Sequence, residues 1–129
     1  MRLLLNTHIA LWAVTGSALL PRQAEAAILA ADEIYVSAAS VWEIAIKHAL
    51  QRGDMPVSSQ NALTAFQDAG YLLLDIRPSH AVGVEKLPPL HPDPFDRLLV
   101  AQALAEPLTL VTSDATIGAY SASIQVMGA

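Results

Sequence analysis

Hydrophobic residues gather in five short bursts along the chain, separated by longer stretches with helical patterning. The bursts cover residues 3–5 (LLL), 34–36 (IYV), 71–76 (YLLLDI), 108–112 (LTLVT) and 123–127 (SIQVM). They are aliphatic and do not alternate with polar residues, which is typical of strands that are covered on both faces. Strands that alternate with helices imply right-handed crossovers, so we predict an α/β fold with a mostly parallel sheet of about five strands flanked by helices.

The stretches between the bursts carry helix start and stop signals, such as serine caps, prolines in first turns and Gly70 after a last turn. The predicted helices start at Thr7, near Pro21, after Ser37 or Ser40, after Ser58 or Ser59, and at Pro78. The clearest start lies in HPDPFDRLLVAQAL, where Asp93 is a good N-cap and Pro94 fits the first helical position. The sequence has no repeat, low-complexity tract or linker, so we expect residues 1–129 to form a single domain.

The composition limits the class of protein. The chain has 129 residues, of which 53% are hydrophobic and 15% charged, and this is too apolar for a disordered protein. No apolar run reaches the roughly 18 residues that a membrane helix needs, and the first residues lack the basic region of a signal peptide. There is no cysteine, which excludes disulfides and thiolate zinc sites and favours a cytoplasmic location.

The charge and the apolar excess indicate different partners. The 12 acidic residues outnumber the 7 basic ones and give a net charge of −5, which disfavours a protein that coats DNA. The apolar excess on so small a chain predicts surface for a second copy or a partner chain, formed by the first half of the sequence.

Four oxygen-bearing side chains are expected at one edge of the predicted sheet, because functional residues in open α/β sheets gather beyond the carboxyl ends of the strands. They are Asn6 after the first strand, Glu43 on the helix after the second, Asp96 in the first turn of the helix before the fourth, and Asp114 after the fourth. Three crowded carboxylates repel one another unless a cation neutralises them. Hard oxygen ligands without cysteine favour Mg²⁺ or Mn²⁺ over zinc.

Each of these residues also has a purely structural interpretation. Glu43 and Lys47 form an i, i+4 pair of the kind that decorates solvated helix faces. Asp96 could complement a helix dipole, Asp114 could start a turn or cap a short helix, and Asn6 could simply end a strand. The four histidines show no two-histidine metal spacing, and only His91 lies beside the acidic residues. Both tryptophans, at positions 12 and 42, fall on apolar helix faces and are expected in the core or an interface.

Four blocks of the sequence resemble a known family. They are LLLNTHIALW, SAASVWEIAIK, HPDPFDRLLVAQAL and LVTSDATIGAY. In this order and at these spacings they are similar to the signature blocks of PIN-domain ribonucleases, in particular the VapC-type toxins of bacterial toxin–antitoxin pairs. The resemblance covers nearly the whole chain.

The resemblance implies a cytoplasmic, metal-dependent endoribonuclease whose acidic quartet binds Mg²⁺ or Mn²⁺ and activates a water molecule for attack on RNA. Matched block by block, the quartet falls on Asn6, Glu43, Asp96 and Asp114. Asp93 would assist through water, and Arg97 would contact a phosphate unless it is simply a solvated helix residue. The family further implies a homodimer or a hetero-oligomer with a VapB-type antitoxin, without a membrane partner.

The first block departs from the family pattern, which has aspartate in L-L-D-T-H where this chain has Asn6. An amide offers one neutral oxygen instead of a charged and potentially bridging carboxylate, so we interpret Asn6 as a disabling substitution, whether deliberate or natural. A non-catalytic module that binds an antitoxin is therefore an alternative. A phosphoryl receiver domain fits poorly, because no acid neighbours Asn6 and the only lysines are Lys47 and Lys86.

Overall fold

Five strands form one parallel sheet in the order β3-β2-β1-β4-β5. The structure is a computed structural model that describes residues 1–121 and 124–127. The strands are β1 (Arg2–Leu5), β2 (Glu33–Ser37), β3 (Leu72–Leu74), β4 (Thr109–Thr112) and β5 (Ile124–Val126). The predicted α/β fold and strand number are confirmed, and each of the four strand pairs is parallel. Ser123, which the sequence pattern placed in the last strand, lies outside the described residues.

Helices connect the strands wherever the sequence predicted them. They are α1 (Thr7–Thr15), α2 (Arg22–Ala30), α3 (Ala38–Ala49), α4 (Ser59–Asp68), α5 (Pro78–Glu85), α6 (Pro94–Ala105) and α7 (Ala115–Gly118). Of the alternative serine caps, the structure uses Ser37 for α3 and Ser58 for α4, whose hydroxyl oxygens accept hydrogen bonds from backbone N–H groups. Asp93 caps α6, and Gly70 follows α4 with a φ of 81°, which only glycine adopts without strain.

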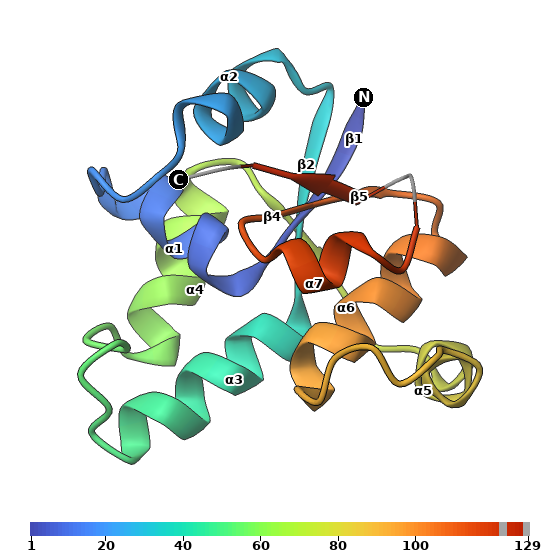
Figure 1. The fold of residues 1–129 in the computed structure, drawn as a ribbon. Helices are drawn as coiled ribbons and strands as arrows, with labels where there is room; N and C mark the ends of the chain where they lie inside the picture. The colour runs from blue at the N-terminus through green and yellow to red at the C-terminus, as the bar shows by residue number, and fades with distance from the viewer. Residues whose placement is uncertain (122–123, 128–129) are drawn as a thin grey trace.

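The hydrophobic core lies in two layers, one on each face of the sheet. Leu3 and Leu5 of β1 point into the layer that α1 to α4 cover, with Phe66 of α4 at its centre. Leu4 points to the opposite face and packs in a cluster with Leu99 of α6 and residues of α7. Figure 1 shows the sheet between these helices, with α5 packed outside α6. This two-sided burial explains why the central strands do not alternate between apolar and polar residues.

The parallel sheet fixes where polar residues can meet. The carboxyl ends of β1, β2 and β4 lie at one edge of the sheet, so the residues that follow these strands are neighbours in space. Asn6 directly follows β1, and its backbone N–H donates to the carbonyl oxygen of Val111 in β4 (3.0 Å). Within the described part of the chain, no helix is long and apolar enough to span a membrane.

Candidate metal-binding site

A cleft of about 340 Å³ opens beyond the carboxyl ends of β1 and β4. All four residues that the sequence singled out, Asn6, Glu43, Asp96 and Asp114, contribute to its lining. They come from distant parts of the chain: the end of β1, the middle of α3, the first turn of α6 and the start of α7. The structure therefore brings them together, as the sequence predicted, and their role as ligands stays a prediction.

Glu43 is buried, with only 4% of its surface exposed, and its carboxylate has two partners in the protein. The Thr7 hydroxyl donates to Glu43 Oε1 (2.7 Å). The Lys47 ammonium forms an ion pair with Oε2, one turn further along α3. The interpretation of Glu43 and Lys47 as a solvated surface pair is thus wrong, because α3 turns Glu43 towards Thr7 of α1 rather than towards water.

Asp96 lies in the first turn of α6, where the Asp93 cap holds the backbone: Asp93 Oδ1 accepts hydrogen bonds from the N–H groups of Phe95 (2.8 Å) and Asp96 (3.2 Å). Asn6 Nδ2 donates to Asp96 Oδ1 (3.2 Å). Burial, reinforced by the nearby charges of Asp93 and Glu43, raises the pKa of Asp96 to about 6. The site thus holds more negative charge than its own partners neutralise.

Asp114 is the N-cap of α7, where its Oδ1 accepts the Thr116 N–H (2.9 Å). Its other oxygen, Oδ2, lies 2.9 Å from His91 Nε2. The pKa of Asp114 lies below its usual value. Burial by itself would raise it, but the hydrogen bonds from His91 and Thr116 have the larger combined effect. Its side chain is still 42% exposed, so this end of the site faces solvent.

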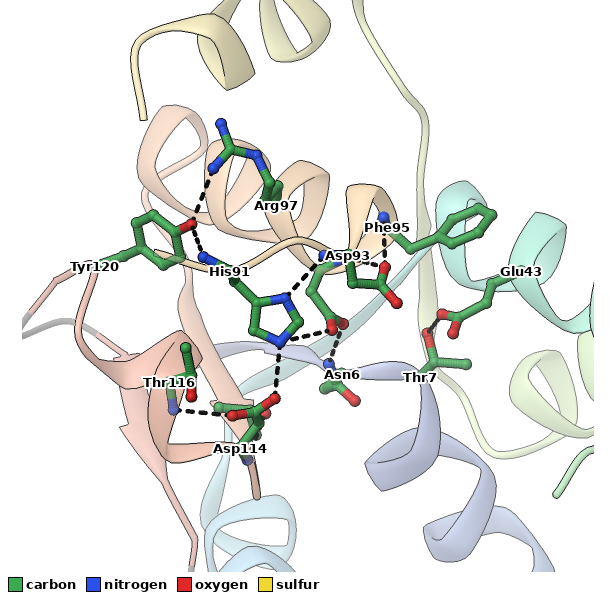
Figure 2. A network of polar contacts seen from close by, with 12 residues as sticks. Asn6, Thr7, Glu43, His91, Asp93, Phe95, Arg97, Asp114, Thr116 and Tyr120 are labelled. Atoms are coloured by element: carbon green, nitrogen blue, oxygen red, sulfur yellow. Dashed lines mark hydrogen bonds and ion pairs between the residues drawn. The ribbon is translucent and has the colours of Figure 1, made fainter. Parts of the chain in front are cut away.

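His91 is the member of the site that the sequence underestimated. Its Nε2 lies 2.9 Å from Asp114 Oδ2 and 3.5 Å from Asp96 Oδ2, and potential ligand atoms of the three residues all lie within 4.8 Å of one another. Figure 2 shows the imidazole directed towards Asp114, with Glu43 and Thr7 at the far end of the group. Its closeness to Asp93 in sequence gave one signal, but its contact with Asp114 depends on tertiary structure.

The Arg97 side chain is hydrogen-bonded within the protein, mainly to backbone carbonyl oxygens. Its guanidinium donates to the carbonyl oxygens of Pro88 (3.0 Å) and Val84 (3.1 Å) and to the Tyr120 hydroxyl (3.0 Å). Figure 2 shows it pointing away from Asn6 towards Tyr120. Both sequence interpretations, a phosphate contact and a solvated helix residue, are therefore wrong for this conformation: Arg97 fastens the turn before α6.

The two tryptophans differ in burial. Trp12 is half-buried, packs against the core layer of α1 to α4 and lines the cleft. Trp42 is 56% exposed and makes an edge-to-face contact with Phe95, with ring centroids 5.1 Å apart. The expectation of a core position is wrong for Trp42, because α3 presents it to solvent beside the first turn of α6.

The donor set fits a divalent cation. Asp96 and Asp114 offer carboxylate oxygens in one cleft with Glu43, which is the ligand chemistry of hard cations. Burial, and after it the charges of Asp93 and Glu43, raises the pKa of Asp96, and a cation would favour its charged form. Asn6 weakens the fit, because its amide nitrogen, a donor, faces Asp96.

Comparisons with known proteins identify the family and the fold. The family model of the PIN domain matches residues 3–122. No curated protein sequence matches the chain significantly. Several solved structures share its fold. A chain of VapBC2 from Rickettsia felis, bound to a promoter DNA fragment, is 18% identical, with 96% of each chain covered and a TM-score of 0.69. A toxin–antitoxin complex from Klebsiella pneumoniae is 18% identical (95% and 94% covered, TM-score 0.66), and FitAcB from Neisseria gonorrhoeae is 19% identical (98% and 96% covered, TM-score 0.63).

Proposed function

The chain belongs to the PIN domain family, and on that premise we propose that it is the toxin of a VapC-type toxin–antitoxin pair, a divalent-metal-dependent endoribonuclease. The observation that carries the proposal is the cleft in which Asn6, Glu43, Asp96 and Asp114 meet. One solved structure that the chain resembles is a toxin–antitoxin complex and another is VapBC2, which supports the choice of partner. Because both RNA and an antitoxin are cytoplasmic partners, the proposed location is the cytoplasm.

Each residue has a proposed role in this activity. Glu43, Asp96 and Asp114 would hold Mg²⁺ or Mn²⁺, and Asn6 occupies the fourth place. A divalent cation here would polarise the scissile phosphodiester and lower the pKa of an attacking water molecule. The protein's own part is orientation: Thr7 and Lys47 fix the Glu43 carboxylate, and the caps of α6 and α7 fix the aspartates at positions 96 and 114.

Asn6 favours a second candidate function, an antitoxin-binding module without turnover. Its side-chain N–H satisfies Asp96 Oδ1 in the absence of a cation (3.2 Å), and an amide contributes no charge to cation binding. Both features favour the metal-free site over the site with a bound cation. The two functions share the fold and the partner and differ only in whether the chain cleaves RNA.

Cleavage of RNA by the chain and by its Asn6→Asp variant separates the two functions. We expect Asn6→Asp to raise the cleavage rate of total cellular RNA by on the order of 10²–10³, since one charged ligand stabilises both the cation and the transition state. The matched control is Asn6→Asp with Asp96→Asn, which should cleave no faster than a blank, as should Asn6→Asp in EDTA. Equal, cation-independent rates in all forms would contradict the nuclease proposal.

Exposed apolar side chains in the first half of the chain support the proposed partner. Leu19 and Leu29 are 67% and 80% exposed, and a hollow of about 350 Å³ between α1 and α2 lies beside Leu29. An antitoxin or a second copy that covers this surface would remove apolar area from water. Sedimentation of the chain should therefore detect self-association that Leu29→Ser weakens, whereas a monomer at all concentrations would require the antitoxin as sole partner.

A further inference from the structure

The hydrogen bonds of His91 fix which ring nitrogen carries the proton. The backbone N–H of Asp93 points at His91 Nδ1 (3.1 Å), and an N–H group can only donate, so Nδ1 must accept. A neutral imidazole has one N–H, which must then be on Nε2. The Nε2–H group faces Asp114 Oδ2 at 2.9 Å and Asp96 Oδ2 at 3.5 Å. The imidazole thus donates a hydrogen bond to Asp114, with the Asp96 carboxylate close beside it.

A donor in this position excludes a cation from the same place. A divalent cation bound by both Asp96 and Asp114 would lie between their oxygens, where the Nε2–H now points. His91 could become a ligand only by moving its proton to Nδ1, and that proton would then meet the N–H of Asp93. In this conformation the imidazole competes with the cation rather than binding it.

The backbone of His91 is held in place, so the ring is the part that can move. The His91 N–H donates to the Tyr120 hydroxyl (2.9 Å), and the same hydroxyl accepts from Arg97 (3.0 Å). Arg97 in turn fastens the preceding turn through the carbonyl oxygen of Pro88. The His91 side chain is 12% exposed and the neighbouring Asp114 side chain 42% exposed, which leaves an open side towards which the ring can rotate.

We propose that His91 is a positioning residue of the cation site: in the metal-free protein its Nε2–H donates to Asp114 and lies beside Asp96, and the ring rotates away when a divalent cation binds. This inference rests on the proposed metal-dependent function. It predicts that His91 weakens cation binding and keeps the two carboxylates together when no cation is present. Tyr120 and Arg97 hold the backbone so that the ring returns to the same place.

Calorimetric titration of Mn²⁺ into the metal-free chain and its His91→Ala variant tests the proposal. Removing a donor to charged acceptors should tighten Mn²⁺ binding by about tenfold, because the cation no longer displaces a hydrogen bond. His8→Ala is the matched control: His8 also lines the cleft, but its ion-pair partner is Asp54 (3.9 Å), outside the carboxylate group. It should leave the affinity unchanged.

Weaker Mn²⁺ binding by His91→Ala would identify His91 as a ligand and overturn the proposal, and so would an unchanged affinity. Absence of Mn²⁺ binding in every variant, including those with Asn6→Asp, would overturn both this inference and the proposed metal dependence. If His91→Ala binds Mn²⁺ more tightly but no variant cleaves RNA, the nuclease proposal alone fails.

Nitrogen NMR of the unsubstituted chain provides a test that needs no variant. In the metal-free protein the ¹⁵N–¹H correlations of His91 should show the proton on Nε2. Saturating Mg²⁺ should change the Nε2 environment to that of a solvated ring and abolish the hydrogen bond to Asp114. A proton on Nδ1, or an imidazole unmoved by bound Mg²⁺, would contradict the proposal.

Discussion

The two ends of the cleft differ in how their negative charge is balanced. At one end Glu43 is buried, accepts a hydrogen bond from Thr7 and pairs with Lys47, so its charge is matched within the protein. At the other end Asp96 accepts a hydrogen bond from the Asn6 amide and Asp114 accepts one from the His91 imidazole, and neither has a Lys or Arg partner among the described residues. At this second end, burial and the neighbouring charges of Asp93 and Glu43 raise the pKa of Asp96.

This contrast separates the Glu43 end of the cleft, where the protein itself balances the charge, from the Asp96 and Asp114 end, where we propose that a cation binds. Thr7 and Lys47 belong to the packed junction of α1 and α3, and they orient Glu43 whether or not a cation is bound. Asn6 and His91 are partners that a cation would replace or displace. Removing the Glu43 carboxylate and removing the Asp96 carboxylate should therefore have opposite effects on the stability of the metal-free protein.

The largest expected effect is at the buried end. Glu43→Ala should lower the free energy of unfolding of the metal-free protein by about 2–4 kcal/mol, because it leaves the Lys47 ammonium without its ion-pair partner and leaves the Thr7 hydroxyl only Ser40 as a partner. Urea denaturation in EDTA measures this. A double-mutant cycle with Lys47→Ala provides the control, in which the double variant should lose less than the sum of the single losses. A gain in stability from Glu43→Ala would contradict the claim that the charge of Glu43 is balanced within the protein.

Asp96→Asn should have the opposite sign. Between pH 4 and 6 the folded chain keeps a proton on Asp96 that the unfolded chain has released, since the pKa rises from 3.8 to about 6 on folding. Stability therefore falls as the pH rises through this window, and at pH 7 Asp96 costs about 2 kcal/mol. Asp96→Asn should remove this cost in EDTA.

The pH profile distinguishes this cause from a general packing effect. The stability difference between Asp96→Asn and the unsubstituted chain should be near zero at pH 3.5 and grow up to pH 7. Carboxylates that do not interact with Asp96 contribute equally to both forms and cancel in the difference. A stability difference that is independent of pH would mean that the charge of Asp96 is not what destabilises the unsubstituted chain.

The smallest effect is expected at Asn6. Asn6→Asp replaces a donor to Asp96 by a fourth carboxylate, so in EDTA it should destabilise the protein by about 1 kcal/mol. Saturating Mn²⁺ should reverse the order of the two forms, because the variant binds the cation more tightly. Thermal melts with and without Mn²⁺ measure both states, and an unchanged order would count against Asn6 as a ligand position.

The sequence predicted most of the fold because its signals are local. Burst length, serine caps and the Asp93-Pro94 start all depend on neighbouring residues, and the two-sided burial of β1 follows from its three leucines. Placing Asn6 and Asp114 side by side needed only the rule that parallel strands have their carboxyl ends at the same edge of the sheet. Their roles stay predictions until they are tested.

What the sequence could not predict depends on contacts between distant segments. The burial of Glu43 depends on how α3 packs against α1, and an i, i+4 pair looks the same on a buried or a solvated face. The role of Arg97 depends on the carbonyl oxygens of a turn that passes nearby, and the contact of His91 joins it to Asp114 across 23 positions. None of these contacts leaves a periodic pattern in the sequence.

The central claim is that Asn6, Glu43, Asp96 and Asp114 form one divalent-cation site, and calorimetric titration with Mn²⁺ tests it most directly. Asn6→Asp should bind Mn²⁺ at least about tenfold more tightly than the unsubstituted chain, since it restores one charged oxygen ligand. Adding Asp114→Asn to that variant should abolish the gain. Equal affinities in the unsubstituted chain and Asn6→Asp would contradict the claim and show that position 6 is not a ligand position.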